Sequence, residues 1–197
     1  MSKIRFTEPN REILARRDSI INDLTRLVDP AGLITSTDEC RAYETDALTA
    51  YRKMPLAVVL PKTTEEVSAV SKYCHDTGVK VVPRGAGTSL AGGAIPSEDA
   101  VVLGLSKMNR VLAVNYDDRF IRVEAGVTNL SVTAVVAENG FFYAPDPSSQ
   151  LACTIGGNIA NNSGGAHCLK YGVTTNNLLG VRMVLIDGSI IDLGGDY

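Results

Sequence analysis

The sequence predicts an α+β fold in which a small parallel βαβ unit precedes a larger mixed or antiparallel sheet with helices. Residues 57–82 place two short, continuously apolar runs on either side of an amphipathic helix, which is the pattern of a buried parallel pair. Later apolar runs are joined by polar turns such as Asp187-Gly188, which favour antiparallel hairpins. Two glycine-rich segments, 85–93 and 156–172, interrupt these elements and are candidate ligand loops.

The composition excludes several function classes. The 197 residues are enough for one large domain or two small ones. The 19 basic and 22 acidic side chains give a net charge of −3 and are scattered, so we expect no nucleic-acid partner. No run approaches 18 apolar residues, and the N-terminus has no signal-peptide core. We therefore expect a cytoplasmic chain without direct membrane insertion.

The cysteines and histidines indicate neither a disulfide framework nor a metal site. The four cysteines show no C-x-x-C and no zinc-finger spacing. Without a secretion signal, we expect them to be reduced. Only two histidines are present, His75 and His167, and we predict no metal ligands. The cysteines are Cys40, Cys74, Cys153 and Cys168.

The first predicted element is an amphipathic helix over residues 11–28, ended by Asp29-Pro30. This helix could pack on its own domain or against another subunit, and we favour its own domain. Residues 1–10 are polar, and we expect them to be frayed. The apolar positions that define the helix are Ile13, Leu14, Ile20, Ile21, Leu24 and Leu27.

A predicted boundary at residue 52 separates this N-terminal helical arm and lead-in, residues 1–52, from a ligand-binding domain over residues 53–197. In the lead-in, we expect specific contacts from Tyr43, Asp46 and Tyr51.

The predicted domain begins with the βαβ unit. Its strands are 57–60 and 79–82, and a right-handed crossover should make them parallel. Between them, Thr63 and Glu66 form a capping-box pattern at the start of a helix, and Gly78 is placed to end it. The strand at 79–82 leads into the first glycine-rich segment, which should lie where α/β sheets usually receive ligands.

The rest of the chain reads as strands, hairpins and one further helix. We expect the second and third of the later strands to pair as a hairpin, and the last two to pair around Asp187-Gly188. The helix over 129–138 should begin at Thr128 and share an inner face of Leu130, Ala134 and Val135. The expected strands are 100–105, 111–114, 120–123, 178–186 and 190–193.

The glycine-rich turn after residue 82 can hold an oxyanion, because glycine permits positive φ and successive N–H groups can then converge on phosphate oxygens. Leu90 stands where the Rossmann fingerprint needs its third glycine, and no Gly-Lys-Ser/Thr follows. By itself, such a turn is a weak signal and is more often a tight connection than a phosphate site. Its sequence is Pro83-Arg84-Gly85-Ala86-Gly87-Thr88-Ser89-Leu90-Ala91-Gly92-Gly93.

A second stretch has an unusual chemistry. Residues 141–149 contain two prolines, and residues 153–165 are nearly devoid of charge but rich in glycine, amides and hydroxyls. Such side chains suit a wall for a neutral ring system that forms hydrogen bonds. A tightly packed helix-turn would explain the glycines but not the crowded amides and hydroxyls, so we interpret the stretch as a ligand wall.

Three separated motifs together resemble a known family. They are Pro83 to Ser89, Pro145-Asp146-Pro147-Ser148, and Thr154-Ile155-Gly156-Gly157-Asn158 with Ser163-Gly164-Gly165 and Tyr171-Gly172. The combination resembles the FAD-binding domain of the vanillyl-alcohol oxidase / p-cresol methylhydroxylase (PCMH) flavoproteins. Within that family, it is most similar to the branch of FAD-linked 2-hydroxyacid dehydrogenases that includes the FAD-binding subunit of bacterial glycolate oxidase. The resemblance covers residues 43–197.

The resemblance implies a PCMH-type FAD-binding domain with noncovalent FAD, because no histidine stands near Thr88, where some members attach the flavin. The residues expected at the FAD pyrophosphate are Arg84, as a nearby cation, and Gly85, Ala86, Gly87, Thr88, Ser89, Gly92 and Gly93. The residues expected beside the flavin are Pro145, Asp146, Pro147, Ser148, Thr154, Ile155, Gly156, Gly157, Asn158, Asn161, Ser163, Gly164, Gly165 and Tyr171.

The implied activity is oxidation of a small 2-hydroxy acid to a 2-oxo acid, with hydride transfer to FAD and electrons passed to partner subunits that could bring the protein to a membrane. Family members continue beyond this length into a cap that carries the catalytic groups. We therefore expect a domain incomplete at its C-terminus, with no catalytic residue and no activity of its own. Two alternatives stay open: a nucleotide-sugar reductase of the same fold, and a non-catalytic nucleotide-binding or assembly module.

Overall fold

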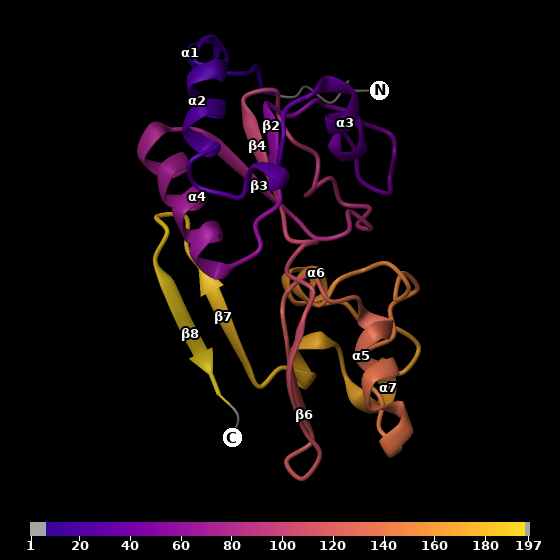
Figure 1. Ribbon diagram of the computed structural model, residues 1–197. Helices are drawn as coiled ribbons and strands as arrows, with labels where there is room; N and C mark the ends of the chain where they lie inside the picture. The colour runs from indigo at the N-terminus through magenta and orange to yellow at the C-terminus, as the bar shows by residue number, and fades with distance from the viewer. Residues whose placement is uncertain (1–6, 196–197) are drawn as a thin grey trace.

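The computed structural model describes residues 7–195. The first part of the chain is organised around a four-stranded sheet (Figure 1). The strand order is β1-β2-β4-β3. β1 is antiparallel to β2, whereas β2, β4 and β3 are mutually parallel. The strands are β1 (Leu33–Ile34), β2 (Ala57–Val59), β3 (Lys80–Arg84) and β4 (Ala100–Gly104).

The two predicted strands of the βαβ unit are confirmed as parallel. They are not neighbours, because β4 enters the sheet between them. β4 is fully buried along its length, and its unbroken apolar run is what a central parallel strand needs. The segment that follows β3 lies at the carboxyl end of the parallel strands, as predicted.

Helices cover both faces of this sheet (Figure 1). On one face, α1 (Arg11–Ala15), α2 (Arg17–Leu24) and α4 (Thr64–Thr77) pack on β2 and β4. On the other, the segment containing α3 (Thr37–Cys40) and the 3₁₀ turn η2 (Arg41–Tyr43) packs on the same strands. A short 3₁₀ turn, η1 (Pro30–Gly32), leads into β1. The core therefore lies on the two sides of β2 and β4.

The predicted single helix over 11–28 is wrong in two respects, because the helix breaks at Arg16 and its second part ends at Leu24. Asp18 lies in the first turn of α2, where a carboxylate favours a new helix start. The favoured packing is confirmed, since Ile13 and Ile20 are buried in the core of the same chain. Of the polar N-terminal stretch, residues 1–6 lie outside the described residues.

The helix α4 begins and ends where predicted. Thr63 Oγ1 accepts the Glu66 N–H at 3.2 Å, and Gly78 ends the helix with φ of +74°. The reciprocal half of the capping box differs from the prediction, because the Glu66 carboxylate accepts the N–H of Lys62 at 2.6 Å. Glu66 therefore bonds the residue before the N-cap and not the N–H of Thr63 itself.

A buried carboxylate ties the start of α1 to the sheet. Asp99 is 1% exposed and accepts hydrogen bonds from the Lys80 ammonium (2.8 Å), the Ser97 hydroxyl (2.6 Å) and the backbone N–H of Asn10 (2.9 Å). Burial alone would raise the pKa of Asp99, but these donors favour the charged form and lower its pKa to about 2.

The second half of the chain consists of two hairpins and short helices below the sheet (Figure 1). The β7–β8 hairpin is docked on α4, where the Ser68 hydroxyl donates to the carbonyl of Gly188 at 2.5 Å. Both predicted hairpins are confirmed. The elements are β5 (Val111–Asn115), β6 (Phe120–Val123), α5 (Asn129–Val136), η3 (Ala137–Asn139), α6 (Ile155–Asn161), α7 (Cys168–Tyr171), η4 (Thr174–Asn177), β7 (Gly180–Val184) and β8 (Ile190–Gly194).

The predicted inner face of α5 is wrong. Leu130 and Val135 are exposed by 39% and 42%, and the buried positions are Asn129, Val132 and Val136. The reason is that a polar residue, Asn129, occupies a core position: its Nδ2 donates to the carbonyl of Pro145 at 2.9 Å. A pattern read from apolar residues alone cannot show such a position.

Candidate functional site

The glycine-rich turn leaves β3 with a row of backbone donors unused by the protein. Within residues 7–195, the amides of residues 86–90 donate no hydrogen bond to a protein acceptor. Gly87 and Gly92 have φ of +71° and +79°, which glycine adopts without strain. Unpaired N–H groups in a turn with alternating φ signs form a concavity that suits an oxyanion.

The side chain of Arg84 packs against this turn and bonds the segments on either side of it. Its guanidinium donates to the carbonyls of Thr45 (2.7 Å) and Ala94 (3.4 Å), and it lies 5.6 Å from the centre of the Tyr43 ring. A Cβ built on Gly87 would overlap the guanidinium. Burial lowers the pKa of Arg84, and the nearby Tyr43 and Asp46 oppose that shift. The predicted role of Arg84 as a cation beside a bound anion stays a prediction.

The lead-in before β2 holds the other end of the turn. Asp46 is 3% exposed, and its carboxylate accepts the N–H of Gly92 (2.8 Å) and of Leu48 (3.0 Å). The N–H of Ala47 donates to the carbonyl of Ser89 at 3.2 Å. Asp46 and Tyr43 thus make the specific contacts expected of them, and Tyr51 accepts a hydrogen bond from the Thr45 hydroxyl.

The start of α6 is pressed against the turn. A Cβ on Gly85 would lie 2.5 Å from Thr154 Oγ1, and one on Gly156 would lie 2.8 Å from the Cβ of Ala125. The amides of Ile155 and Gly156 donate to the carbonyls of residues 127 and 125, each at 2.8 Å. Close packing therefore accounts for Gly85 and Gly156, and it brings two predicted site segments together.

An orphaned amide lies in the middle of α6. Asn158 is 1% exposed, and its Nδ2 has no hydrogen-bond partner among the described residues. A buried donor without a partner costs about 1–3 kcal/mol, so such groups call for an explanation. The amide of Asn161 instead donates to the carbonyl of Gly157.

The remaining predicted residues form a second group around Asp146. Its carboxylate accepts the backbone N–H of His167 at 3.0 Å and lies 3.3 Å from His167 Nδ1. Gly165 packs so closely on Asp146 that a Cβ there would overlap the Asp146 carbonyl. Tyr171 meets the Phe142 ring edge-on at 5.8 Å.

Further along this group, Ser163 accepts hydrogen bonds from the N–H and hydroxyl of Thr174, and a Cβ on Gly164 would overlap the Cys168 sulfur. Pro145 and Pro147 are buried, whereas Ser148 is exposed. The helix α6 connects the two groups, since its first turn meets Gly85 and the loop 163–165 follows its end.

A cavity of about 500 Å³ adjoins the turn where it meets α6. Gly85, Ala86 and Thr154 line it, together with residues that the sequence reasoning missed: Ser106, Asn109 and Ser131. Ser106 and Asn109 follow β4 at the carboxyl end of a parallel strand, and this position could have identified them. Its polar lining is neutral, which matches the character expected of a wall for an uncharged ring.

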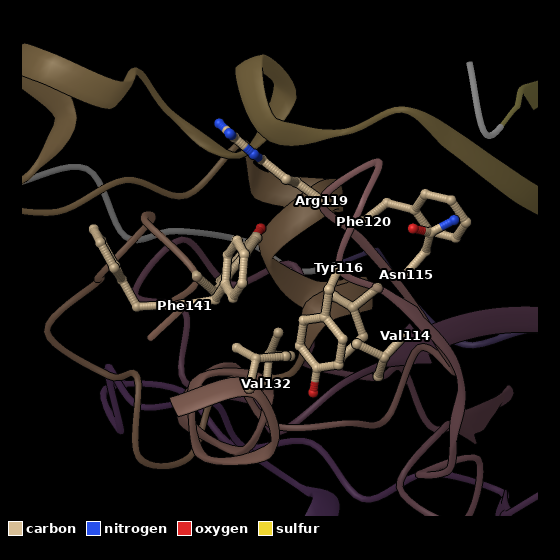
Figure 2. A pocket seen from close by; sticks show the side chains of 11 residues that line it. Val114, Asn115, Tyr116, Arg119, Phe120, Val132 and Phe141 are labelled. Atoms are coloured by element: carbon tan, nitrogen blue, oxygen red, sulfur yellow. The ribbon is translucent and has the colours of Figure 1, made fainter. Parts of the chain in front are cut away.

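A second cavity, of about 100 Å³, lies between the β5–β6 hairpin, α5 and the segment after it (Figure 2). Figure 2 shows Tyr116, Phe141 and Val132 around it. It includes none of the predicted site residues and is too small for a nucleotide.

Three further observations limit the chemistry of the described residues. All four cysteines are free thiols. No group of three or more histidine, cysteine, aspartate or glutamate side chains between residues 7 and 195 could hold a metal ion. In the same range, no helix is both long and apolar enough to cross a bilayer.

Comparison with known proteins gives the relatives of this chain. It is 47% identical over 180 residues to the glycolate oxidase subunit GlcD of Escherichia coli strain K12, covering 91% of this chain and 36% of that protein. It is 39% identical over 178 residues to the D-lactate dehydrogenase of Archaeoglobus fulgidus, covering 90% of this chain and 39% of that protein. The chain thus spans little more than a third of the curated relatives it matches.

Solved structures show the same fold. An alkyldihydroxyacetonephosphate synthase matches 96% of this chain and 36% of its own with a TM-score of 0.80 at 21% identity. A p-cresol methylhydroxylase with substrate bound matches 93% and 36% with a TM-score of 0.76 at 20% identity. The predicted PCMH-type α+β fold is confirmed.

A family model described as an FAD binding domain matches residues 55–194. The free amides of the turn and the orphaned amide of Asn158 are the kinds of donor that a dinucleotide with a pyrophosphate and a neutral ring would engage. The residues present therefore fit FAD, the cofactor that this family implies, and the chain belongs to the FAD-binding-domain family.

Proposed function

We propose that this chain is the FAD-binding part of a flavin-dependent dehydrogenase or oxidase that converts a small 2-hydroxy acid, such as glycolate, to the 2-oxo acid. The proposal that the chain binds FAD rests on the backbone amides of residues 86–90, which donate to no protein acceptor among residues 7–195 and lie beside the uncharged helix α6. The substrate class rests on relatives named glycolate oxidase, D-lactate dehydrogenase and D-2-hydroxyglutarate dehydrogenase.

In this proposal, the turn binds the anionic centre of the cofactor. The amides of residues 86–90 and the hydroxyl of Thr88 donate to pyrophosphate oxygens, while Arg84 keeps the turn in shape through Thr45 and Ala94. Binding is noncovalent, because the turn holds no histidine.

The uncharged segments 154–158 and 163–165 lie against the flavin and exclude water from it. Asn158, buried without a partner for its Nδ2, donates that hydrogen bond toward the cofactor. Bound FAD supplies the hydride acceptor for substrate oxidation. None of the described residues is assigned to proton abstraction, and the catalytic groups belong to the remainder of the full-length protein.

The partners follow from the relative named as a glycolate oxidase subunit. We propose electron-accepting partner subunits that receive the electrons from FAD. The protein is proposed to work in the cytoplasm and to reach a membrane only through such partners.

The test is an absorbance scan of the purified protein at its natural length after incubation with FAD and desalting. Flavin bands at about one FAD per chain that bleach anaerobically on addition of glycolate or D-lactate would support the proposal. Release of all flavin on denaturation would support noncovalent binding. A folded protein that retains no flavin would refute it and favour a non-catalytic module, and bleaching by NADPH alone would favour a nucleotide-sugar reductase.

A further inference from the structure

Asp146 forms the bridge between two segments of the proposed flavin wall. Its side chain is 17% exposed and comes from the proline-flanked segment 145–148. Both carboxylate oxygens face the loop after α6: Oδ1 accepts the N–H of His167 at 3.0 Å, and Oδ2 lies 3.3 Å from His167 Nδ1. One carboxylate thus accepts a hydrogen bond from the backbone of His167 and lies beside the imidazole of the same residue.

That loop has few other attachments. Its start is held where Ser163 accepts from Thr174, and inside the loop the N–H of Gly165 points to the sulfur of Cys168 at 2.9 Å. Among the described residues, the hydrogen bonds that join positions 164–167 to the segment 145–148 are those of Asp146. The hydrogen bonding between the two segments therefore depends on this carboxylate.

The two segments pack closely where Gly165 meets Asp146. Gly165 lies flat on the Asp146 backbone, where a Cβ would overlap the carbonyl group. On the far side, the His167 ring meets the rings of Phe142 and Tyr171, with centroids 6.3 Å away in both cases. The imidazole, whose side chain is 54% exposed, thus lies near one carboxylate and two aromatic rings.

We propose that Asp146 is a positioning residue of the FAD site: it does not touch the flavin but sets the distance between the segments 145–148 and 163–167 that flank it, acting through His167. The inference rests on the proposed function, since it needs FAD to lie against these segments. It differs from the sequence-based expectation, in which Asp146 lines the cofactor directly.

The experiment compares Asp146→Asn, Asp146→Ala and the wild type at natural length, by FAD titration and visible flavin spectra. The alanine removes both acceptors, and the isosteric asparagine keeps one and loses the charge. Because hydrogen bonds to charged groups are the strong ones, we expect the Kd for FAD to rise about 10- to 100-fold for Asp146→Ala and about 3- to 10-fold for Asp146→Asn. Both spectra should shift, because the flavin environment changes.

Two further variants complete the design. Gly165→Ala keeps the Asp146 carboxylate but places a Cβ that overlaps both its backbone carbonyl and its Oδ1, so it should push the same segments apart, weaken FAD binding and shift the spectrum. Asp192→Asn is the matched control, because Asp192 makes a two-pronged pair with Arg182 (2.8 and 2.9 Å) on the exposed β7–β8 hairpin. Its Kd and spectrum should equal those of the wild type.

The outcomes separate the two proposals. A wild type that retains no FAD refutes the proposed function and this inference with it. A wild type that binds FAD, with Asp146→Asn and Gly165→Ala both within twofold of its Kd and with unchanged spectra, refutes the positioning role alone. A purely structural role would lower the melting temperature of the apoprotein and leave the band positions of bound flavin unmoved, and that result also overturns the inference.

Discussion

Replacing Gly87 with alanine tests the geometry of the turn most directly. The backbone at Gly87 has φ of +71°, a conformation that costs an L-residue about 1–2 kcal/mol. The added Cβ would also overlap the guanidinium of Arg84, which donates to Thr45 at 2.7 Å. Losing a hydrogen bond to a charged group costs about 1.5–3 kcal/mol. The two terms together amount to about 3–5 kcal/mol.

Whether this energy weakens FAD binding or lowers the free energy of unfolding depends on whether the turn changes its conformation. If the turn distorts, its amides no longer converge, and FAD binding should weaken by about 100-fold or more, since about 1.4 kcal/mol corresponds to tenfold. If the turn holds, the same energy should reduce the free energy of unfolding. The assay is an FAD titration paired with urea unfolding of the apoprotein, both on the natural-length protein.

Neighbouring glycines provide the controls. Gly93 has no positive φ, and a Cβ there meets nothing within 4 Å, so Gly93→Ala should leave the free energy of unfolding of the apoprotein unchanged. At Gly92, φ is +79° but the nearest atom is Ile95 Cδ1 at 3.8 Å, so Gly92→Ala carries the strain without the overlap. If Gly87→Ala matches the wild type in FAD affinity and Gly93→Ala in stability, the reasoning about Arg84 and the turn is wrong.

Two further predictions concern stability. Gly156→Ala places a Cβ 2.8 Å from that of Ala125. This overpacking should lower the free energy of unfolding by about 1–3 kcal/mol, measured by urea titration. An unchanged midpoint would contradict the close approach. Asp99→Asn should cost about 2 kcal/mol at pH 7, because the pKa of Asp99 is lowered from 3.8 to about 2 on folding. That stabilisation is present above pH 3.8 and is lost as the pH falls toward 2. The free energies of unfolding of the wild type and Asp99→Asn should therefore converge over this range. A difference in stability that does not change with pH would contradict the ionised-carboxylate explanation.

Local chemistry explains which elements could be predicted. Strands, hairpins and the ends of α4 follow from short-range signals, such as Thr63 at a helix start, Gly78 at its end and Asp187-Gly188 between two strands. The place of β4 between β2 and β3 could not be predicted from these signals, because the order of buried apolar strands depends on packing between distant segments. The inner face of α5 was missed for a related reason, since Asn129 is buried by its bond to Pro145.

The candidate site shows the same division. Glycines in turns and the uncharged character of residues 153–165 could be recognised locally. Other contacts join residues 3 to 46 positions apart in the sequence. Arg84 folds back under Gly87, the Asp46 carboxylate accepts the N–H of Gly92, and the Asp146 carboxylate accepts the N–H of His167. Such contacts are visible only once the fold has brought the segments together.

The strand order has a consequence for how the cofactor turn is held. β3 and β4 are hydrogen-bonded neighbours over five residue pairs, and the whole connection between them, residues 85–99, is the loop that carries the turn. The pairing of the edge strand β3 with β4 therefore closes this loop, and the cost in loop-closure entropy is offset by pairing with a strand that is buried along its whole length. Releasing the ends of the loop and separating β3 from β4 are, for this topology, one event, so a ligand bound to the loop would also stabilise the pairing of these two strands.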